Sequence, residues 1–320
     1  MRSASALSGL TIGVILLAIV ALQPGETITL ALAGDVMLGR GTAQSHAQGG
    51  WEYTLAALAP CAAVADIAFA NLESPLTLAP LIKDTYDLRA PPEASLALLH
   101  AGFSVVSLAN NHIQDAGFQG VQDTQRSLRA MGIHPIGPDE GPWMTKVNDQ
   151  SLSWFAFDDT LRPLKIENLH LKLESQRPGT DLIIVSIHWG NELDTVPNAR
   201  QRKLAMELAT AGADIIIGHH SHVLQPIEWV WGSGRGRPTL VAYSLGNTLF
   251  DQAAPPGTRY GAVLLVNIGS AGVQSVCTLP TQIDPTSWRT IYASPTATEV
   301  ITHSLKLSCI LTPTCMMMEK

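Results

Sequence analysis

Short apolar runs that alternate with helical stretches most constrain how this chain of 320 residues folds. Residues 27–35 (TITLALAGD), 67–73 (IAFANLE) and 182–190 (LIIVSIHWG) are nearly continuous in apolar residues, as strands are when both faces of a sheet are buried. Amphipathic stretches lie between such runs, for example residues 118–132 and 200–212. The alternation predicts an α/β fold with helices outside a buried sheet.

The later part of the chain has a different pattern. The strands predicted from residues 239–247 to 275–284 follow one another without long helices. This spacing predicts a second, more antiparallel sheet. We expect three segments: an N-terminal signal or anchor at 1–25, the main folded domain at 26–285, and a tail at 286–320 whose weak periodicity assigns it no fold.

The N-terminus contains an uncharged apolar stretch, from about residue 7 to 23, after a single positive charge at Arg2. A cleaved signal peptide and an uncleaved membrane anchor both fit this stretch, and a buried core helix is the third interpretation. The first two place the rest of the chain outside the cytoplasm. The net charge of −7 and the lack of a Lys/Arg run argue against nucleic-acid binding.

The four cysteines, Cys61, Cys277, Cys309 and Cys315, form no C-x-x-C pair, so a zinc ribbon is not indicated. Cys309 and Cys315 are close in sequence, and in an oxidising compartment they are candidates for a disulfide. Two free thiols are the alternative.

Side chains that bind metals or move protons follow five of the predicted strands. They are Asp35; Glu73; Asn110, Asn111 and His112; His188; and His219, His220 and His222. Each alone has a structural explanation, such as a turn residue or a packed histidine. Because ligand sites in α/β sheets form at the carboxyl ends of strands, their repetition there predicts one shared site.

The donor types indicate the chemistry of this site. Carboxylate, amide and imidazole ligands without thiolate suit Mn, Fe or Zn. One or two such divalent ions would bind phosphoryl oxygens and activate water, and a free histidine beside them would protonate a leaving group.

Six segments carry a resemblance to a known family. They are AGDVMLGR (33–40), NLESPL (71–76), SLANNHIQDAG (107–117), VSIHWGNE (185–192), GADIIIGHHSHVLQPIE (212–228) and YSLGNTLFD (243–251). In this order they resemble the CapA family, which is named for a bacterial poly-gamma-glutamate capsule synthesis protein. That family is similar to the calcineurin-like metallophosphoesterases, so the resemblance implies a two-sheet αββα sandwich.

The resemblance also implies roles for individual residues. The metal ligands would be Asp35, Glu73, Asn111, His188, His220 and His222. His112 would be the proton donor, oriented by Asp115. Met37 stands where the superfamily has a histidine ligand, which puts one of two metal positions in doubt.

Two further residues are candidates for substrate contact. Arg40 is a cation that suits an anionic oxygen, although a surface role fits it equally, and Asn247 ends the segment at 243–247 in a turn. The functional hypothesis is an extracytoplasmic metal-dependent hydrolase of capsule or poly-gamma-glutamate synthesis, acting on a phosphoester or an anionic polymer. The alternative is a non-catalytic polymer-binding component of a membrane-associated capsule-synthesis complex.

Overall fold

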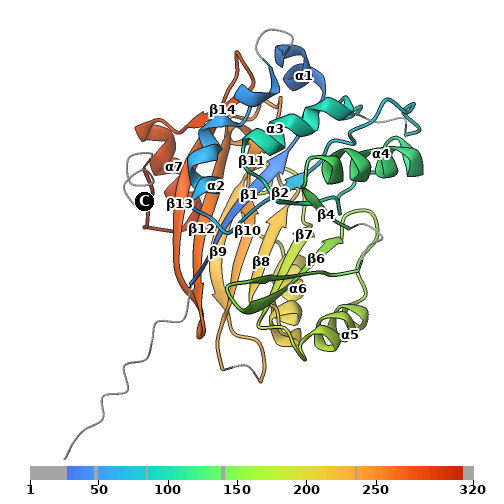
Figure 1. The fold of residues 1–320 in the computed structure, drawn as a ribbon. Helices are drawn as coiled ribbons and strands as arrows, with labels where there is room; N and C mark the ends of the chain where they lie inside the picture. Colours follow the sequence, from blue (N-terminus) through green and yellow to red (C-terminus); the bar gives the residue numbers. More distant parts are fainter. Residues whose placement is uncertain (1–26, 47–49, 84–85, 138–140, 235, 313–320) are drawn as a thin grey trace, which may run out of the picture.

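Two β-sheets packed face to face, with helices on their outer faces, make up the protein in a computed structural model (Figure 1). The structure describes residues 27–46, 50–83, 86–137, 141–234 and 236–312. The predicted N-terminal signal or anchor, residues 1–25, lies outside them. Among the described residues, no helix is both long enough and apolar enough to cross a membrane.

The first sheet has the strand order β14-β13-β12-β1-β2-β3-β4, and β11 pairs with β1 beside this path. Strands β1, β2, β3 and β4 are parallel, whereas β12, β13 and β14 run antiparallel to their neighbours. The strands are β1 (Ile28–Val36), β2 (Ile67–Leu72), β3 (Val105–Ser107), β4 (His134–Ile136), β11 (Asn247–Leu249), β12 (Tyr260–Gly269), β13 (Gly272–Asp284) and β14 (Arg289–Tyr292).

The second sheet has the order β5-β6-β7-β8-β10-β9. Its central strands β6, β7, β8 and β10 are parallel, and the two edge strands are antiparallel to them. The strands are β5 (Trp143–Val147), β6 (Gln150–Asp158), β7 (Leu182–His188), β8 (Ile215–His219), β9 (Leu224–Val230) and β10 (Thr239–Leu245).

The α-helices of the described chain lie mainly on the outer faces of the two sheets. They are α1 (Arg40–His46), α2 (Ala59–Ala63), α3 (Ser95–His100), α4 (Gly117–Ala130), α5 (Ile166–Gln176), α6 (Ala199–Ala211) and α7 (Pro295–Leu305). Helices α2, α3 and α4 pack on the first sheet, and α5 and α6 on the second (Figure 1). Helix α6 begins with an Asn198 capping box and ends at Gly212 in a left-handed conformation.

The continuous apolar runs of the strands are explained by burial on both faces. On β8, Ile215 and Ile217 point into the core between the sheets, and Ile216 points outward to the layer of α5 and α6. On β1, Leu30 and Leu32 face the inner core, and Ala31 packs under the helices of the first sheet. The predicted αββα sandwich is therefore confirmed.

The predicted division of the later strands is wrong in one respect. β12 and β13 are antiparallel as expected, but β10 is parallel to β8, and the later strands do not form a sheet of their own. β10 joins β8 in the second sheet, whereas β12 and β13 extend the first sheet beyond β1. A pattern of apolar residues indicates which faces of a strand are buried, but it does not indicate which strand it pairs with. Long-range packing decides the pairing.

The segment at 286–320, to which the sequence assigned no fold, contains β14 and α7. Helix α7 starts at a Ser294 cap and buries Ala297, Ile301 and Leu305 in the core between the sheets. It contacts both β9 of the second sheet and β13 of the first. The helix thus closes one open side of the sandwich (Figure 1).

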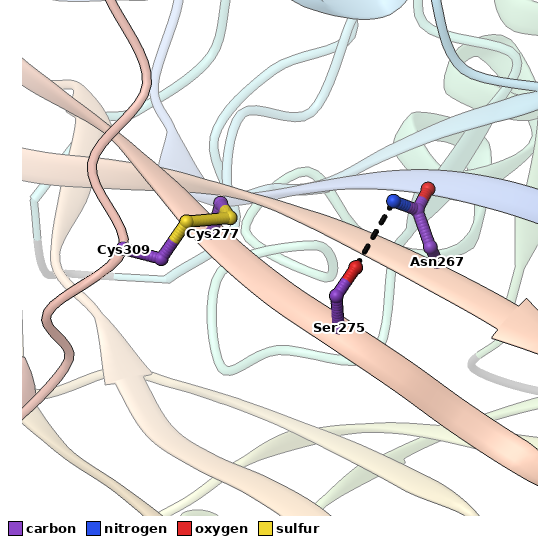
Figure 2. The surroundings of a disulfide bond; sticks show 4 residues. All are labelled: Asn267, Ser275, Cys277 and Cys309. Atoms are coloured by element: carbon purple, nitrogen blue, oxygen red, sulfur yellow. Dashed lines mark hydrogen bonds between the residues drawn. A yellow bond between two sulfur atoms is a disulfide. The ribbon is translucent and has the colours of Figure 1, made fainter.

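A disulfide fastens the chain beyond α7 to the first sheet. Cys309 bonds to Cys277 on β13, with 4.6 Å between the Cα atoms, near a pair formed by Asn267 and Ser275 (Figure 2). Neither the candidate pairing of Cys309 with Cys315 nor the alternative of a free Cys309 is right, because Cys277 is adjacent to Cys309 in space although distant in sequence. Cys61 is a free, buried thiol, and Cys315 lies outside the described residues.

We expect Cys309→Ser to lower the free energy of unfolding. The bond closes a loop with a sequence separation of 32, for which chain entropy gives a loss of about 3–4 kcal/mol. Chemical denaturation with and without a reductant measures this. Reductant should bring the wild type to the level of the variant and leave the variant unchanged; a wild type insensitive to reductant would contradict the expectation.

Candidate metal centre

The strand ends of both sheets converge on one buried cluster. Asp35 on β1 and Asn71 on β2 are register partners in the first sheet, and His188 on β7 and His219 on β8 are partners in the second. The side chains of this cluster are nearly inaccessible to solvent: Asp35, Glu73, His188, His219, His220 and His222. The structure therefore brings together these strand-end residues.

Glu73 lies at the centre of the cluster. Its Oε1 is 3.1 Å from Nε2 of His188, and its Oε2 is 3.8 Å from Nδ1 of His222. No donor among the described residues reaches either oxygen with hydrogen-bond geometry, although the side chain is fully buried. An unpartnered buried carboxylate is strongly unfavourable, so these oxygens suit a cation.

Two ligand sets share this carboxylate. Glu73, His188 and His220 form one, and Asp35, Glu73 and His222 form the other; in each, the ligand atoms lie within 4.8 Å of one another. Asn111 lies beside the first set, with its Oδ1 2.9 Å from Nε2 of His188. The residues present therefore fit one or two divalent ions, with Glu73 between them.

Met37 does not enter this cluster. It is fully buried in an apolar group with Leu88, Phe250 and Ile283, and its sulfur accepts a hydrogen bond from the Gly39 amide. The second ligand set consequently has methionine rather than histidine at the position where the resemblance implies a ligand. Asp35, Glu73 and His222 still meet without it.

Burial keeps two of the imidazoles uncharged. It lowers the pKa of His188 to about 3 and, together with the nearby His188, that of His220 to about 3. Neutral imidazole is the form that binds metals. Nδ1 of His220 has no hydrogen-bond partner among the described residues, so its lone pair or proton is left for a ligand.

The two carboxylates respond to burial differently. Burial opposes the ionisation of Asp35, but the hydrogen bond and charge of His219 outweigh it and hold the pKa of Asp35 below its usual range. Burial raises the pKa of Glu73. Burial would lower the pKa of His222, but Glu73 and Asp35 raise it. His222 and each of the two carboxylates therefore favour one another's charged forms.

The backbone after β8 is unusual where it presents its histidines. His220 and His222 have φ angles of 90° and 57°, a region that costs residues other than glycine about 1–3 kcal/mol each. Gly218 precedes them because a Cβ there would lie 2.1 Å from the Tyr243 carbonyl oxygen. Strain of this kind concentrates at functional sites.

His112 stands beside the cluster in a chain of polar contacts. Its Nδ1 is 2.8 Å from Oδ2 of the fully buried Asp115. Lys83, from the loop between β2 and α3, places its Nζ 3.0 Å from the other oxygen of Asp115 and donates to the Asn111 carbonyl at 2.6 Å. Lys83 thereby fixes the loop that carries both a candidate ligand and the candidate acid.

The two candidates for substrate contact are engaged within the protein. Arg40 pairs with Asp251, which also accepts a hydrogen bond from the Gly41 amide at 2.8 Å. Asn247 is fully buried; its Oδ1 lies 3.0 Å from Nδ1 of His222, and its amide donates to the Thr258 carbonyl. Asn247 thus contacts a candidate metal ligand, whereas Arg40 lines a small cavity together with His112 and His222.

The sequence reasoning did not assign roles to three residues at this site. Asn71 donates to Oδ1 of Asp35 at 2.9 Å, Lys83 contacts Asp115, and Glu192 forms a third ligand set with His220 and His222 on the exposed side. Asn71 and Glu192 lie in segments that carry the family resemblance, which is the signal that could have found them. His219, which is not among the predicted ligands, has its Nδ1 3.1 Å from Oδ1 of Asp35.

A cavity of about 570 Å³ lies beside the cluster, at Asn111 and Glu192. Its lining residues are Lys83, Tyr86, Asn111, His112, Asp115, Leu161 and Glu192. A smaller cavity of about 230 Å³ shares Tyr86, His112 and Glu192 with it and also reaches His222. A ligand can therefore contact His112 and the metal-ligand cluster together.

Solved structures agree with the fold. A hypothetical protein from Thermus thermophilus has a TM-score of 0.51 at 16% identity, covering 80% of this chain and 99% of that one. A putative 5'-nucleotidase from Staphylococcus aureus has a TM-score of 0.50 at 18% identity, covering 87% and 58%. At these identities the likeness concerns the fold alone.

Sequence relatives include capsule proteins. The chain is 30% identical over 260 residues to the capsule biosynthesis protein CapA of Bacillus anthracis, covering 72% of this chain and 61% of the relative. It is 31% identical over 250 residues to the PGA biosynthesis protein CapA of Bacillus subtilis strain 168, covering 71% and 64%. It thus spans less than two thirds of either relative. Residues 29–252 match the family described as "Bacterial capsule synthesis protein PGA_cap", and the chain belongs to this family, as the resemblance to CapA predicted.

Proposed function

We propose that this protein is a metal-dependent hydrolase of capsule-polymer synthesis that acts on a phosphoester or an anionic polymer outside the cytoplasm. The observation that carries the proposal is the buried carboxylate of Glu73, which has no hydrogen-bonding partner among the described residues and is shared by two ligand sets. Mn, Fe or Zn suits the set of carboxylate, amide and imidazole donors. Such an ion would supply a Lewis acid for phosphoryl oxygens.

The chain's own residues supply the remaining chemistry. His112 faces the cavity beside the cluster and is oriented through Nδ1 by Asp115. This leaves Nε2 for proton transfer to a leaving group. Lys83 keeps Asp115 and the Asn111 carbonyl in place. The names of the Bacillus relatives support capsule-polymer synthesis as the setting.

Two features support a location outside the cytoplasm. The Cys277–Cys309 disulfide is of a kind that persists in oxidising compartments. The apolar N-terminal stretch suits an export signal or an anchor. Alkylation of thiols in whole cells before lysis tests the location. In an exported protein Cys277 and Cys309 should stay unmodified because they form a disulfide, whereas in a cytoplasmic protein they would be free thiols and would be alkylated.

The test of the activity is a metal analysis combined with turnover. The full chain is purified, its bound metals are measured, and a generic phosphomonoester and phosphodiester are assayed with added Mn²⁺. We expect bound metal and a hydrolysis rate that His220→Ala abolishes. A metal-free protein, or a rate that this variant leaves unchanged, would contradict the proposal.

A second candidate is a binding component without turnover, and the position of Met37 favours it. A buried thioether occupies the place of one expected ligand, so the second ion would be held by fewer groups. This candidate predicts bound metal and polymer binding, together with no hydrolysis of either ester.

A further inference from the structure

Another cavity, of about 580 Å³, borders the loop that carries His112. It is called the second cavity below, and the cavity of about 570 Å³ that His112 lines is called the first. Asn110 and Gln114 of this loop line it, whereas Asn111 and His112 line the cavity at the metal-ligand cluster. Leu161 belongs to the lining of both cavities. The two cavities therefore adjoin at Leu161, and one extended ligand can occupy both.

The second cavity offers positive charge that the protein does not neutralise. Arg162 and Lys172 line it, and within the described chain neither forms an ion pair. Most of the other described arginines pair with carboxylates: Arg40, Arg89, Arg126, Arg177, Arg200, Arg202 and Arg237. Arg162 and Lys172 are exposed, and in a chain of net charge −7 they give the lining of this cavity local positive charge.

The rest of the lining suits an anion as well. Asp158 is the acidic residue among the lining side chains, and its Oδ1 accepts hydrogen bonds from the Thr160 amide at 2.8 Å and hydroxyl at 2.6 Å. Its charge is thus partly satisfied within its own turn. The Lys172 ammonium lies 5.7 Å from the centroid of the Phe157 ring, which helps to hold it over the cavity. Gln114 and Gln176 add amide donors.

We propose that this second cavity binds an anionic group, a carboxylate or a phosphate, that belongs to the same substrate whose reacting group lies at the metal-ligand cluster. The inference rests on the proposed function and refines its substrate class. The substrate is a linear polyanion that passes over Leu161, rather than a small phosphoester that fills the first cavity alone. Arg162 and Lys172 contact the distal charge and take no part in the chemical step.

The test compares binding with turnover in the full chain. Arg162→Gln with Lys172→Gln should weaken binding of a long glutamate oligomer or a long polyphosphate roughly tenfold in calorimetry at low salt. The probe that loses affinity identifies the anion. The same variant should hydrolyse a small phosphodiester with unchanged kcat/KM. The matched control is Lys165→Gln with Lys203→Gln, which removes the same charge at exposed positions outside the cavity linings.

Two results would overturn the inference: unchanged affinity of the cavity variant for both probes, or an equal loss in the control variant, which would reveal a general charge effect. Binding does not need turnover. If the wild type binds a probe through Arg162 and Lys172 but hydrolyses nothing, the proposed activity fails and the anion site stands. If the wild type hydrolyses the small esters but the cavity variant binds both probes as the wild type does, the anion site fails and the proposed activity stands.

Discussion

Replacing Glu73 with glutamine is expected to abolish metal binding and to stabilise the metal-free protein at the same time. Both oxygens of Glu73 are buried without a hydrogen-bonding donor among the described residues, and burial raises the pKa of the carboxyl. Because its folded pKa lies above the unfolded value of 4.5, this group costs stability once the pH rises past that value. A neutral amide removes the cost, but it binds a cation far more weakly.

Thermal unfolding with and without Mn²⁺ measures both effects. Metal at about a hundredfold excess over Kd should stabilise the wild type by about 3 kcal/mol and leave Glu73→Gln unchanged. Without metal, the variant should unfold at the higher temperature, and its phosphodiester hydrolysis should fall at least about a hundredfold. The control is Glu174→Gln on the exposed face of α5. A variant that Mn²⁺ still stabilises would show that Glu73 is not a ligand.

His112→Gln should lower kcat about a hundredfold or more while the bound metal stays the same, since general acid catalysis contributes about 10²–10⁴. His112 lies in the cavity, but its Nδ1 is engaged by Asp115 and it belongs to none of the ligand sets. Metal content and kcat are measured on the same preparation. His100→Gln, at an exposed histidine of α3, is the control. Loss of metal from the His112 variant would place His112 among the ligands instead.

Lys83→Met extends this experiment to the residue that holds Asp115. Removing the ammonium leaves the buried Asp115 with His112 as its remaining side-chain partner among the contacts described. We expect a smaller fall in kcat than for His112→Gln, together with a changed pH profile, because the Asp115 charge would then act on His112 alone. Lys83→Arg should restore most of the activity. An unaltered pH profile of the Lys83→Met variant would show that Lys83 has only a structural role.

The sequence predicted the location of the site because strand ends are easily recognised. Asp35, Glu73 and His188 each follow an uninterrupted apolar run, and parallel strands bring their carboxyl ends to one edge. It is notable that these strands belong to two different sheets. The site forms across the edge of the sandwich, so the face-to-face packing of the sheets, rather than one sheet alone, sets the distance between His188 and Glu73.

Contacts between distant, irregular segments could not be predicted in this way. Lys83 belongs to a loop without periodicity, and nothing in its neighbours indicates that it crosses to Asp115. The partner of Cys309 depends on the path of the chain after α7, which brings it beside Cys277. Similarly, the apolar pattern of β12 fits either sheet equally, and only its pairing with β1 decides between them.

Strand β1, which carries Asp35, pairs with strands that are synthesised much later in the chain. Ile28 at the start of β1 pairs with Ile268 on β12, and Asp35 pairs with Asn247 on β11. The pairing of β1 with β11 and β12 can therefore form only after these later strands have been made. Asp35 has all of its strand neighbours only after β11 has been synthesised, so we expect metal to bind to the completed domain rather than to the growing chain.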